Sequence, residues 1–256
     1  MHLQNRCSVL GYPVDVESQS SALSLIQEAW QSGQPLHVVT LNAEMVMQSR
    51  RDARLAQIIK AAGLIVPDGA GVLFAIRFKS DKYAKAQRLP GIELADATLA
   101  AAAAEKLPVA LLGGRPEVMQ KLLTVLPERH PGLVIQSHQD GFFKSEEEAA
   151  IVQSIADKGP KLVLVALGVP KQEFFIAKYK DKFPHAVMIG VGGSFDVWTG
   201  FVERAPQKYQ DLHLEWFYRL KKEPWRFRRM ASTLPPFAFH AALEIVKTRL
   251  SGKGDS

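Results

Sequence analysis

The sequence predicts an α/β fold: a Rossmann-like, doubly wound, mostly parallel sheet followed by a helical, basic C-terminal appendage. Short runs rich in Val, Ile and Leu recur up to about residue 200, and amphipathic stretches separate them. These apolar runs do not alternate with polar residues, which is typical of strands buried on both faces of a parallel sheet. Beyond residue 200 the strand-like runs stop, and the sequence becomes helical and basic.

The predicted strands and helices alternate along the chain. The strands are Leu36–Leu41, Leu64–Val66, Val109–Leu112, Leu133–Gln136, Leu162–Leu167 and Val187–Val191. The helices between them are Ser20–Ser32, Ala43–Ala62, Gly71–Phe78, Gly91–Glu105, Pro116–Arg129, Ser145–Asp157 and Lys171–Lys182. Alternation at this spacing favours right-handed βαβ units, which build a doubly wound sheet.

The chain divides by composition into an α/β domain, residues 1–203, and an appendage, residues 204–256. In the appendage we predict a helix over His213–Ala231, interrupted near Pro224, and a second helix from about Phe237 to Leu250. The appendage holds 11 Lys and Arg against 5 Asp and Glu, whereas residues 1–203 hold 21 of each. The whole net charge of +6 therefore lies in the appendage. Such asymmetry predicts an anionic partner, whether phosphate, nucleic acid or a lipid surface.

Composition also points to a cytoplasmic protein. Cys7 is the single cysteine, so the sequence offers no intrachain disulfide. The N-terminus lacks the apolar block of a signal peptide. The most apolar stretch, Met230–Val246, is interrupted by two prolines, a histidine and a glutamate, and we expect no membrane-spanning helix.

Several common catalytic motifs are absent. Gly190–Phe195 resembles a dinucleotide fingerprint, but Phe195 stands where that motif needs glycine or alanine, and the segment follows the last strand instead of the first. The sequence contains no G-x-x-x-x-G-K-[ST], G-x-S-x-G or H-E-x-x-H motif. Its seven histidines show no metal-ligand spacing, so we predict no metal site.

Small and polar residues follow the predicted strands at their carboxyl ends. The segments are Thr40–Glu44, Pro67–Gly71, Gly113–Pro116, Asp140–Phe142, Gly168–Glu173 and Gly190–Asp196. Ligands of open parallel sheets bind outside these ends, so the segments predict one crevice. Glycine backbone amides in such a crevice suit a diphosphate, although glycines such as Gly113 and Gly114 are by themselves more often simple turn residues.

Asp68 is the leading candidate for chemistry in this crevice. A carboxylate followed by small residues can take a proton from an incoming hydroxyl group; the alternative is that Asp68 caps the next helix. Thr40 and Asn42 can bind sugar hydroxyls or cap the helix that begins near Ala43. Gln172 and Glu173 can read the polar edge of a ring, or Glu173 can simply favour a helix N-terminus.

The appendage interleaves basic and aromatic residues between Trp216 and Arg229. Arginines spaced in this way can bind phosphate groups in bidentate fashion. Trp, Tyr and cationic side chains can equally lie at the surface of an anionic membrane. The plainest alternative is a solvated basic helix face.

Together these segments resemble the signature of the WecG/TagA/CpsF glycosyltransferases. The resemblance runs in order from Gly11 to about Arg229 and rests on five blocks. They are Thr40-Leu41-Asn42, Pro67-Asp68-Gly69-Ala70-Gly71, Gly168 to Glu173, Phe195-Asp196 with Gly200 and Glu203 to Pro206, and Leu214-Glu215-Trp216 through Arg219 to Arg226. Five ordered blocks are more specific than any single glycine motif.

The resemblance implies an inverting, metal-independent transferase without a cofactor, in agreement with the absence of a D-x-D pair. It implies a UDP-sugar donor, with N-acetylmannosamine as the expected sugar, and an acceptor sugar on a polyprenyl diphosphate carrier. It places the enzyme at the cytoplasmic face of the plasma membrane, held there by the appendage. The product would enter cell-surface polysaccharide synthesis.

Carried over to this sequence, the resemblance makes Asp68 the catalytic base and Thr40 its partner in the sugar pocket. The appendage would supply arginines that close over the site. The candidate substrate-binding residues are Asn42, Gly69, Gly71, Arg88, Gly113, Gly114, Gly168, Pro170, Gln172, Glu173, Gly190, Gly192, Phe195, Asp196, Arg219, Arg226 and Arg229.

Two other functions stay open at this point. A non-catalytic module that binds anionic lipid or nucleic acid would use the basic appendage, but it leaves the glycine-rich strand ends and Asp68 unexplained; we therefore expect no nucleic-acid partner. An epimerase or another enzyme of UDP-sugars would use the same crevice. The sequence does not fix the donor sugar, nor whether an exposed apolar helix face makes the protein a homo-oligomer.

Overall fold

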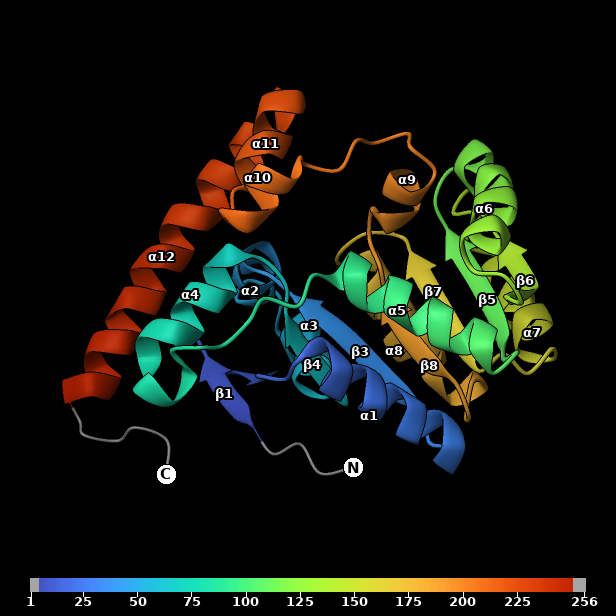
Figure 1. Ribbon diagram of the computed structural model, residues 1–256, viewed down its shortest axis with the longest axis horizontal. Coiled ribbons are helices and arrows are strands. Elements are labelled where there is room, and N and C mark those ends of the chain that lie inside the picture. The colour runs from blue at the N-terminus through green and yellow to red at the C-terminus, as the bar shows by residue number, and fades with distance from the viewer. Residues whose placement is uncertain (1–4, 251–256) are drawn as a thin grey trace.

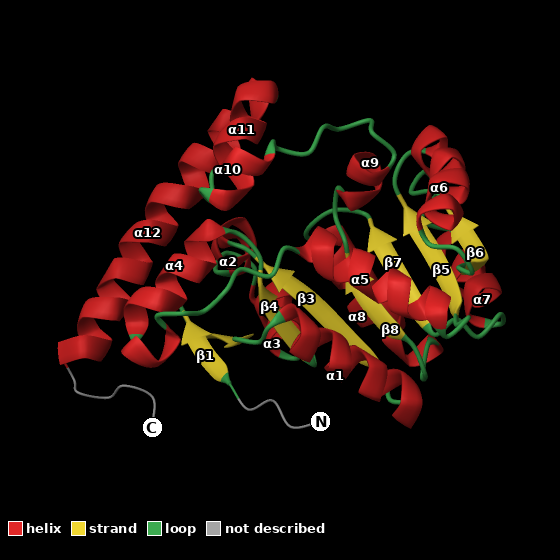
Figure 2. Ribbon diagram, viewed as in Figure 1, coloured by secondary structure: helices red, strands yellow, loops and turns green. Residues whose placement is uncertain are grey.

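The computed structural model describes residues 5–250, except for the side chain of Arg226. Its centre is a six-stranded, all-parallel sheet in the order β4-β3-β8-β7-β5-β6, with helices on both faces (Figures 1 and 2). The strands are β3 (Leu36–Leu41), β4 (Leu64–Pro67), β5 (Pro108–Gly113), β6 (Val134–Gln139), β7 (Leu162–Ala166) and β8 (Val187–Gly190). The predicted fold class and all six predicted strands are confirmed, with shifts of one to three residues at their ends.

Helices cover both faces of the sheet. Successive side chains of a strand point to opposite faces, so each face carries apolar side chains that a helix layer must bury. Val38 packs in the core under α1 (Gln19–Ser32), α5 (Gly91–Ala104) and α6 (Pro116–Arg129). Val39, the next residue, packs in the core on the other face. The remaining helices of this domain are α2 (Ala43–Ser49), α3 (Ala53–Lys60), α4 (Ala70–Lys79), α7 (Glu148–Ala156), α8 (Lys171–Tyr179) and α9 (Ser194–Trp198). Short 3-10 turns span Asp81–Tyr83 and Lys180–Lys182.

The single helix predicted over Ala43–Ala62 is wrong, because the chain forms two helices there. Helix α2 ends at Ser49, and Asp52 begins α3 by accepting hydrogen bonds from the backbone N–H groups of Arg54 and Leu55. Asp is a strong N-cap residue. Asp52 therefore starts a second helix within a stretch whose amphipathic pattern predicted a single continuous helix.

A two-stranded antiparallel hairpin, β1 (Arg6–Val9) and β2 (Tyr12–Asp15), was not predicted. Its two-residue turn places Leu10 and Gly11 at positive φ, the conformation that tight hairpin turns require. Asp15 is fully buried and joins the hairpin to the sheet, since its carboxylate accepts from Arg6 Nε at 2.6 Å and from Ile65 N at 2.8 Å.

The appendage is helical as predicted, but its last helix begins earlier. It comprises α10 (Gln207–Asp211), α11 (Glu215–Lys222), a 3-10 turn (Pro224–Arg226) and α12 (Phe227–Leu250). The interruption near Pro224 is confirmed. The helix start after Pro236 is wrong, because α12 runs through both Pro235 and Pro236. Packing of α12 against the main domain offsets the roughly 3 kcal/mol that an interior proline costs.

Helix α12 lies along α2 and α4, at the left of Figure 1. Phe237 and Ala241 are buried in the same core cluster as the hairpin and β4. Gly71 permits this close approach, because a Cβ at that position would stand 3.3 Å from the Phe237 ring. The expected boundary at residue 203 falls in the segment between α9 and α10. No helix in residues 5–250 is both long enough and apolar enough to cross a membrane.

We predict that Phe237→Ala loosens the appendage. Truncating a buried Phe costs about 3–5 kcal/mol, and here the loss falls on the α12 contact with α2 and α4. Limited proteolysis should cleave residues 199–206 faster than in the wild type. Phe239→Ala, on the same helix but 62% exposed, is the control and should leave the cleavage rate unchanged. Equal cleavage of both variants would contradict this account of the docking.

Candidate functional site

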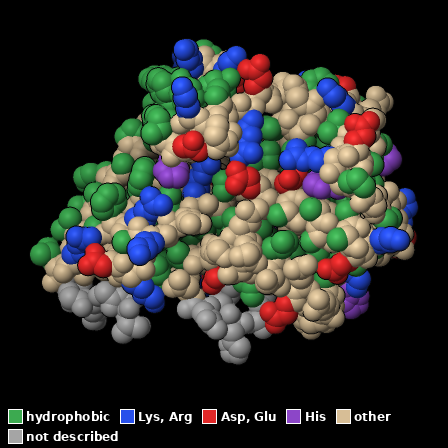
Figure 3. Space-filling view, in the orientation of Figure 1, with side chains coloured by type: hydrophobic (Ala, Val, Ile, Leu, Met, Phe, Trp, Pro, Cys, Tyr) green, Lys and Arg blue, Asp and Glu red, His purple; other side chains and the backbone are tan. Residues whose placement is uncertain are grey.

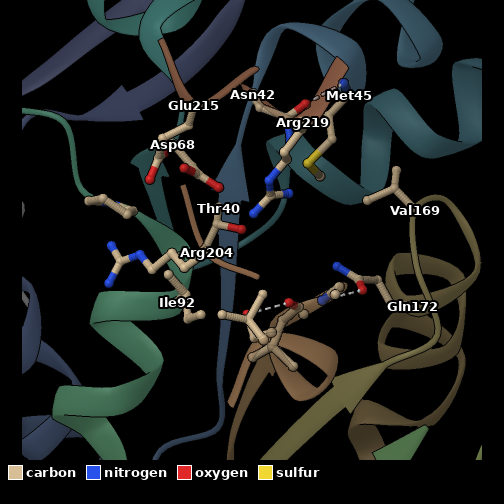
Figure 4. A pocket seen from close by; sticks show the side chains of 18 residues that line it. Thr40, Asn42, Met45, Asp68, Ile92, Val169, Gln172, Arg204, Glu215 and Arg219 are labelled. Carbon is tan, nitrogen blue, oxygen red and sulfur yellow. Dashed lines mark hydrogen bonds between the residues drawn. The ribbon is translucent and has the colours of Figure 1, made fainter. Parts of the chain in front are cut away.

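Three neighbouring strands end at one polar cavity of about 160 Å³, which we call the glycine cavity (Figure 4). Thr40 belongs to β3, Asp68 follows β4, and Gly190 ends β8 and is followed by Val191–Gly193. The sheet order places β3 between β4 and β8, so these three segments converge although they are far apart in sequence. In Figure 4 the carboxylate of Asp68 and the guanidinium of Arg219 approach this space from one side and Gln172 from the other.

A larger cavity of about 430 Å³, which we call the aromatic cavity, adjoins the glycine cavity. It lies between α4 and the appendage. Its apolar lining includes Phe74, Trp216, Met230, Leu234 and Phe237. Four residues line both cavities, namely Asn42, Asp68, Glu215 and Arg219. The Asp68 carboxylate thus stands where a polar space and an apolar space meet.

Asp68 does not cap the helix that follows it, so the capping alternative for Asp68 is wrong. The N-cap of α4 is Gly69, which makes no side-chain hydrogen bond. Instead the backbone N–H of Gly91, at the start of the 14-residue helix α5, lies near the Asp68 carboxylate and lowers its pKa. Gly91 must lack a side chain, because a Cβ there would stand 2.9 Å from the Thr40 side chain. The positive end of α5 therefore faces the carboxylate.

Burial raises the pKa of Asp68 to about 6. Arg88 and Arg219 oppose this rise, Glu215 adds to it, and the Gly91 N–H opposes it. Near neutral pH the carboxylate is thus ionised but close to titration. A carboxylate with a pKa near the working pH is the form suited to accept a proton during a reaction.

The appendage contributes two charged side chains near Asp68, one acidic and one basic. Glu215 and Arg219 come from α11, and Glu215 Oε2 lies 2.6 Å from Nη1 of Arg88, a residue of the main domain. Only 8% of the Arg88 side chain is exposed, so this ion pair closes one wall of the aromatic cavity. The electrostatic state of Asp68 therefore depends on the docked appendage.

Asn42 caps a helix and also faces the site. Its side chain accepts a hydrogen bond from Met45 N at 3.0 Å and caps α2, as the structural alternative predicted. Asn42 also lines both cavities, beside Asp68. Gly69 and Gly71 line the aromatic cavity, and because they have no side chains they leave more room in it.

The glycine loop after β8 is held by Gln172. The side-chain oxygen of Gln172 accepts from Gly192 N at 3.0 Å. Gly192 has a φ of +51°, in the left-handed region that favours glycine. The next residue, Gly193, lines the cavity, and its N–H has no partner among the described residues. Glu173 lies buried beneath Gln172 and does not line the cavity.

Several candidate residues lie away from both cavities. Gly113 ends β5 and Gly114 follows it. Strand β5 is separated from β3 by β8 and β7, and neighbouring strands lie about 4.8 Å apart. Phe195 is fully buried and packs against Gly114 and Trp198. Asp196 pairs with Arg115 at 3.2 Å. Gly168 and Pro170 flank Val169, which, like Gln172 of the same segment, lines the glycine cavity.

The candidate arginines occupy different places. Arg219 lines both cavities, while Arg88 and Arg229 line the aromatic cavity. Arg229 Nε lies 3.2 Å from Glu44 Oε2, which ties α12 to α2 beside the cavity mouth. The side chain of Arg226 lies outside the described part of the structure.

Sequence reasoning missed several residues that line the site, among them four that are polar or make room for it. Gly91 and Arg204 line the glycine cavity, His213 lines the aromatic cavity, and Glu215 lines both. Arg204 pairs with Glu93 of α5, while its buried Nε has no partner among the described residues. His213 adopts a φ of +58°, which is rare for residues other than glycine. Arg204 and Glu215 belong to the five sequence blocks that resemble the glycosyltransferase signature, so their place in those blocks is the signal that could have identified them.

Within residues 5–250, no group of three or more His, Cys, Asp or Glu side chains is arranged to hold a metal ion. The site combines the carboxylates of Asp68 and Glu215 with several arginines, backbone amides and amide side chains. Such a set can bind anionic groups and accept one proton.

A parallel α/β sheet with a glycine loop, a titratable carboxylate and arginines at its carboxyl edge is typical of a ligand site that can bind anionic groups. The chain belongs to the WecG/TagA/CpsF family of glycosyl transferases, whose family model matches residues 7–251. It is therefore a glycosyltransferase, and the resemblance noted in the sequence is confirmed.

A curated relative from Bacillus spizizenii is 38% identical over 195 residues, which is 76% of this chain and 74% of that protein. The relative is an N-acetylglucosaminyldiphosphoundecaprenol N-acetyl-beta-D-mannosaminyltransferase. The matched stretch is long enough to include most of the fold described above.

We predict that Asp68→Asn stabilises the protein at pH 8. A raised pKa means that the folded state binds a proton more tightly than the unfolded state, so ionised Asp68 costs stability above about pH 6. A rise of about two pKa units corresponds to a cost of up to about 3 kcal/mol. Urea unfolding should show this gain at pH 8, and the gain should shrink as pH falls from 6 to 4.

Asp96→Asn is the control for this experiment. Asp96 pairs with Arg129 and His130 at the surface, so its removal should give no gain at pH 8. A destabilised Asp68→Asn variant at pH 8 would contradict the raised pKa of Asp68.

Proposed function

We propose that this glycosyltransferase moves N-acetylmannosamine from a UDP-sugar to a sugar carried on a polyprenyl diphosphate, with inversion at the anomeric carbon. The observation that carries the proposal is the position of Asp68, whose carboxylate is shared by a glycine-lined polar cavity and an apolar cavity with arginines. The activity of the 38% identical relative from Bacillus spizizenii supports this choice of substrates. The domain division at residue 203 remains part of the proposal.

The reaction is a single displacement. Asp68 takes the proton of the acceptor hydroxyl as its oxygen attacks the anomeric carbon of the donor. The bond from that carbon to the UDP oxygen breaks on the opposite face, and the UDP diphosphate takes the electron pair. The unpartnered N–H of Gly193 and the guanidinium of Arg219 are the donors available to the leaving diphosphate. Thr40 lies across the same cavity, where it can orient the sugar.

The aromatic cavity suits the acceptor. Arg88, Arg219 and Arg229 line it together with Phe74, Trp216 and Phe237, so charged and apolar surfaces meet in one space. A polyprenyl diphosphate has the same division, since its diphosphate is anionic and its chain is apolar. The larger volume of this cavity, about 430 Å³ against about 160 Å³, agrees with a bulkier ligand.

Association with the membrane surface is supported by the outer face of α12. Exposed apolar residues recur there at helical spacing, at Phe239, Leu243, Val246 and Leu250. Lys and Arg side chains lie beside apolar ones over the region of α11 and α12, at the upper left of Figure 3. An apolar stripe flanked by cations favours the surface of an anionic membrane.

We predict that the wild type transfers N-acetylmannosamine from its UDP form to a short-chain polyprenyl diphosphate N-acetylglucosamine. Asp68→Asn should lose about 10²- to 10⁴-fold in kcat, as expected for removal of a general base, and should still bind UDP. Because the base must be ionised, the wild-type rate should fall tenfold per unit below about pH 6. Product formation is followed by chromatography over a panel of UDP-sugars.

The surface variant Asp96→Asn is the control and should keep the wild-type rate. An Asp68→Asn enzyme with near wild-type turnover would remove Asp68 as the base. Conversion of the UDP-sugar without any acceptor would instead identify an epimerase.

We predict that the double variant Phe239→Glu and Leu243→Glu weakens binding to anionic liposomes by more than about tenfold. Each substitution removes apolar contact and adds a charge of the same sign as the lipid. Sedimentation with phosphatidylglycerol vesicles measures the effect. Val134→Glu, an exposed apolar position on β6, is the matched control. Equal sedimentation of the double variant and the wild type would exclude α12 as the membrane contact.

A further inference from the structure

A buried chain of hydrogen bonds runs from His37 on β3 to Gly192 in the glycine loop. His37 Nε2 lies 2.9 Å from Glu173 Oε2. Gln172 Nε2 donates to the other carboxylate oxygen, Glu173 Oε1, at 3.1 Å. Gln172 Oε1 in turn accepts from Gly192 N at 3.0 Å. The three side chains are 11%, 1% and 2% exposed for His37, Glu173 and Gln172, so water does not compete freely for these contacts.

The direction of each hydrogen bond follows from the groups involved. The backbone N–H of Gly192 can only donate, so Gln172 must present its oxygen to it. The amide NH₂ of Gln172 must then face an acceptor. An ionised carboxylate only accepts, and Glu173 therefore fixes the orientation of the Gln172 amide. Glu173 lies in the first turn of α8, where the helix favours a negative charge.

Gly190 makes room for this arrangement. A Cβ at Gly190 would overlap the amide nitrogen of Gln172 and stand 2.8 Å from Glu173 Oε1. The side chains of Gln172 and Glu173 thus lie directly against the backbone of β8. Packing against Gln172 and Glu173 therefore explains why a glycine occupies position 190, without any contact to a substrate.

We propose that Glu173 is a positioning residue for the transfer reaction: through Gln172 it holds the Gly192 backbone so that the neighbouring Gly193 N–H faces the donor diphosphate. His37 supports it by donating to the second carboxylate oxygen. The role rests on the proposed function, because it presumes that the donor binds in the glycine cavity. Glu173 itself touches no substrate, since it lies beneath that cavity.

Glu173→Met tests this role, because Met has a similar length but offers no acceptor oxygen to Gln172. Loss of one orienting hydrogen bond corresponds to about a tenfold change. We expect about a tenfold rise in the dissociation constant for UDP by titration calorimetry and a similar rise in KM for the donor, with a smaller change in kcat. Hydrogen exchange at the Gly192 amide should also accelerate, while the rest of β8 remains protected.

Two further comparisons separate positioning from stability. Glu148→Met removes a carboxylate that holds α8 through Lys178 and Tyr179, far from the loop, and should leave UDP binding unchanged even if the melting temperature falls. His37→Leu should weaken UDP binding, whereas His37→Gln keeps an N–H at the position of Nε2 and should restore it. The pair at His37 decides the question if Glu173→Met does not fold.

The outcomes are distinct. Unchanged UDP binding and unchanged Gly192 exchange in a folded Glu173→Met protein would overturn the role of Glu173 alone. With Glu173→Met unfolded, equal UDP binding by His37→Leu and His37→Gln would overturn it as well. A wild-type protein that does not bind UDP would overturn the donor assignment beneath it and the proposed function with it.

Discussion

The desolvation of one carboxylate governs this site. Asp68 stands at the end of β4 where two cavities meet, and its burial raises the pKa to about 6. The protein compensates with three groups, the N–H of Gly91 and the guanidinium groups of Arg88 and Arg219. A fourth group, Glu215, acts in the opposite sense. This balance leaves the carboxylate ionised at neutral pH while its proton affinity stays high, which suits a group that must accept a proton.

The balance around Asp68 requires segments that are distant in the chain. Gly91 begins α5, Arg88 belongs to the loop before it, and Glu215 and Arg219 come from the appendage. The ion pair between Arg88 and Glu215 directly joins the loop before α5 to the appendage. A displaced appendage would therefore change the proton affinity of Asp68 as well as the shape of the aromatic cavity. Docking of α12 and the chemistry of the site are thus coupled in one structure.

The opposite wall of the glycine cavity depends on hydrogen-bond direction more than on charge. Gln172 contacts the loop, and Glu173 beneath it restricts which way the Gln172 amide can point. Gln172, which lines the cavity, and Glu173, which accepts a hydrogen bond from it, are neighbours in the sequence, although Glu173 does not line the cavity. Two neighbouring residues of one sequence motif thus differ in position, one at the cavity and one beneath it, and the sequence alone does not distinguish them.

The sequence by itself determined the alternation of strands and helices, because buried parallel strands leave continuous apolar runs that need no tertiary information to be seen. It also placed Asp68, Thr40 and Gly190 at strand ends, where ligands bind. The strand order came only from the tertiary structure. That order puts β4, β3 and β8 side by side and leaves Gly113 and Gly114 of β5 away from the cavity.

Contacts between distant segments decided the rest. The capping by Asp52 split a predicted helix, and packing of α12 on α2 and α4 carried a helix through Pro235 and Pro236. The roles of Glu215, Arg204 and Glu173 depend on partners 100 residues or more away in the chain, at Arg88, Glu93 and His37. Local sequence fixes which elements can form, whereas burial and pairing across the fold fix which side chains meet, because only folding brings such partners within reach of a hydrogen bond.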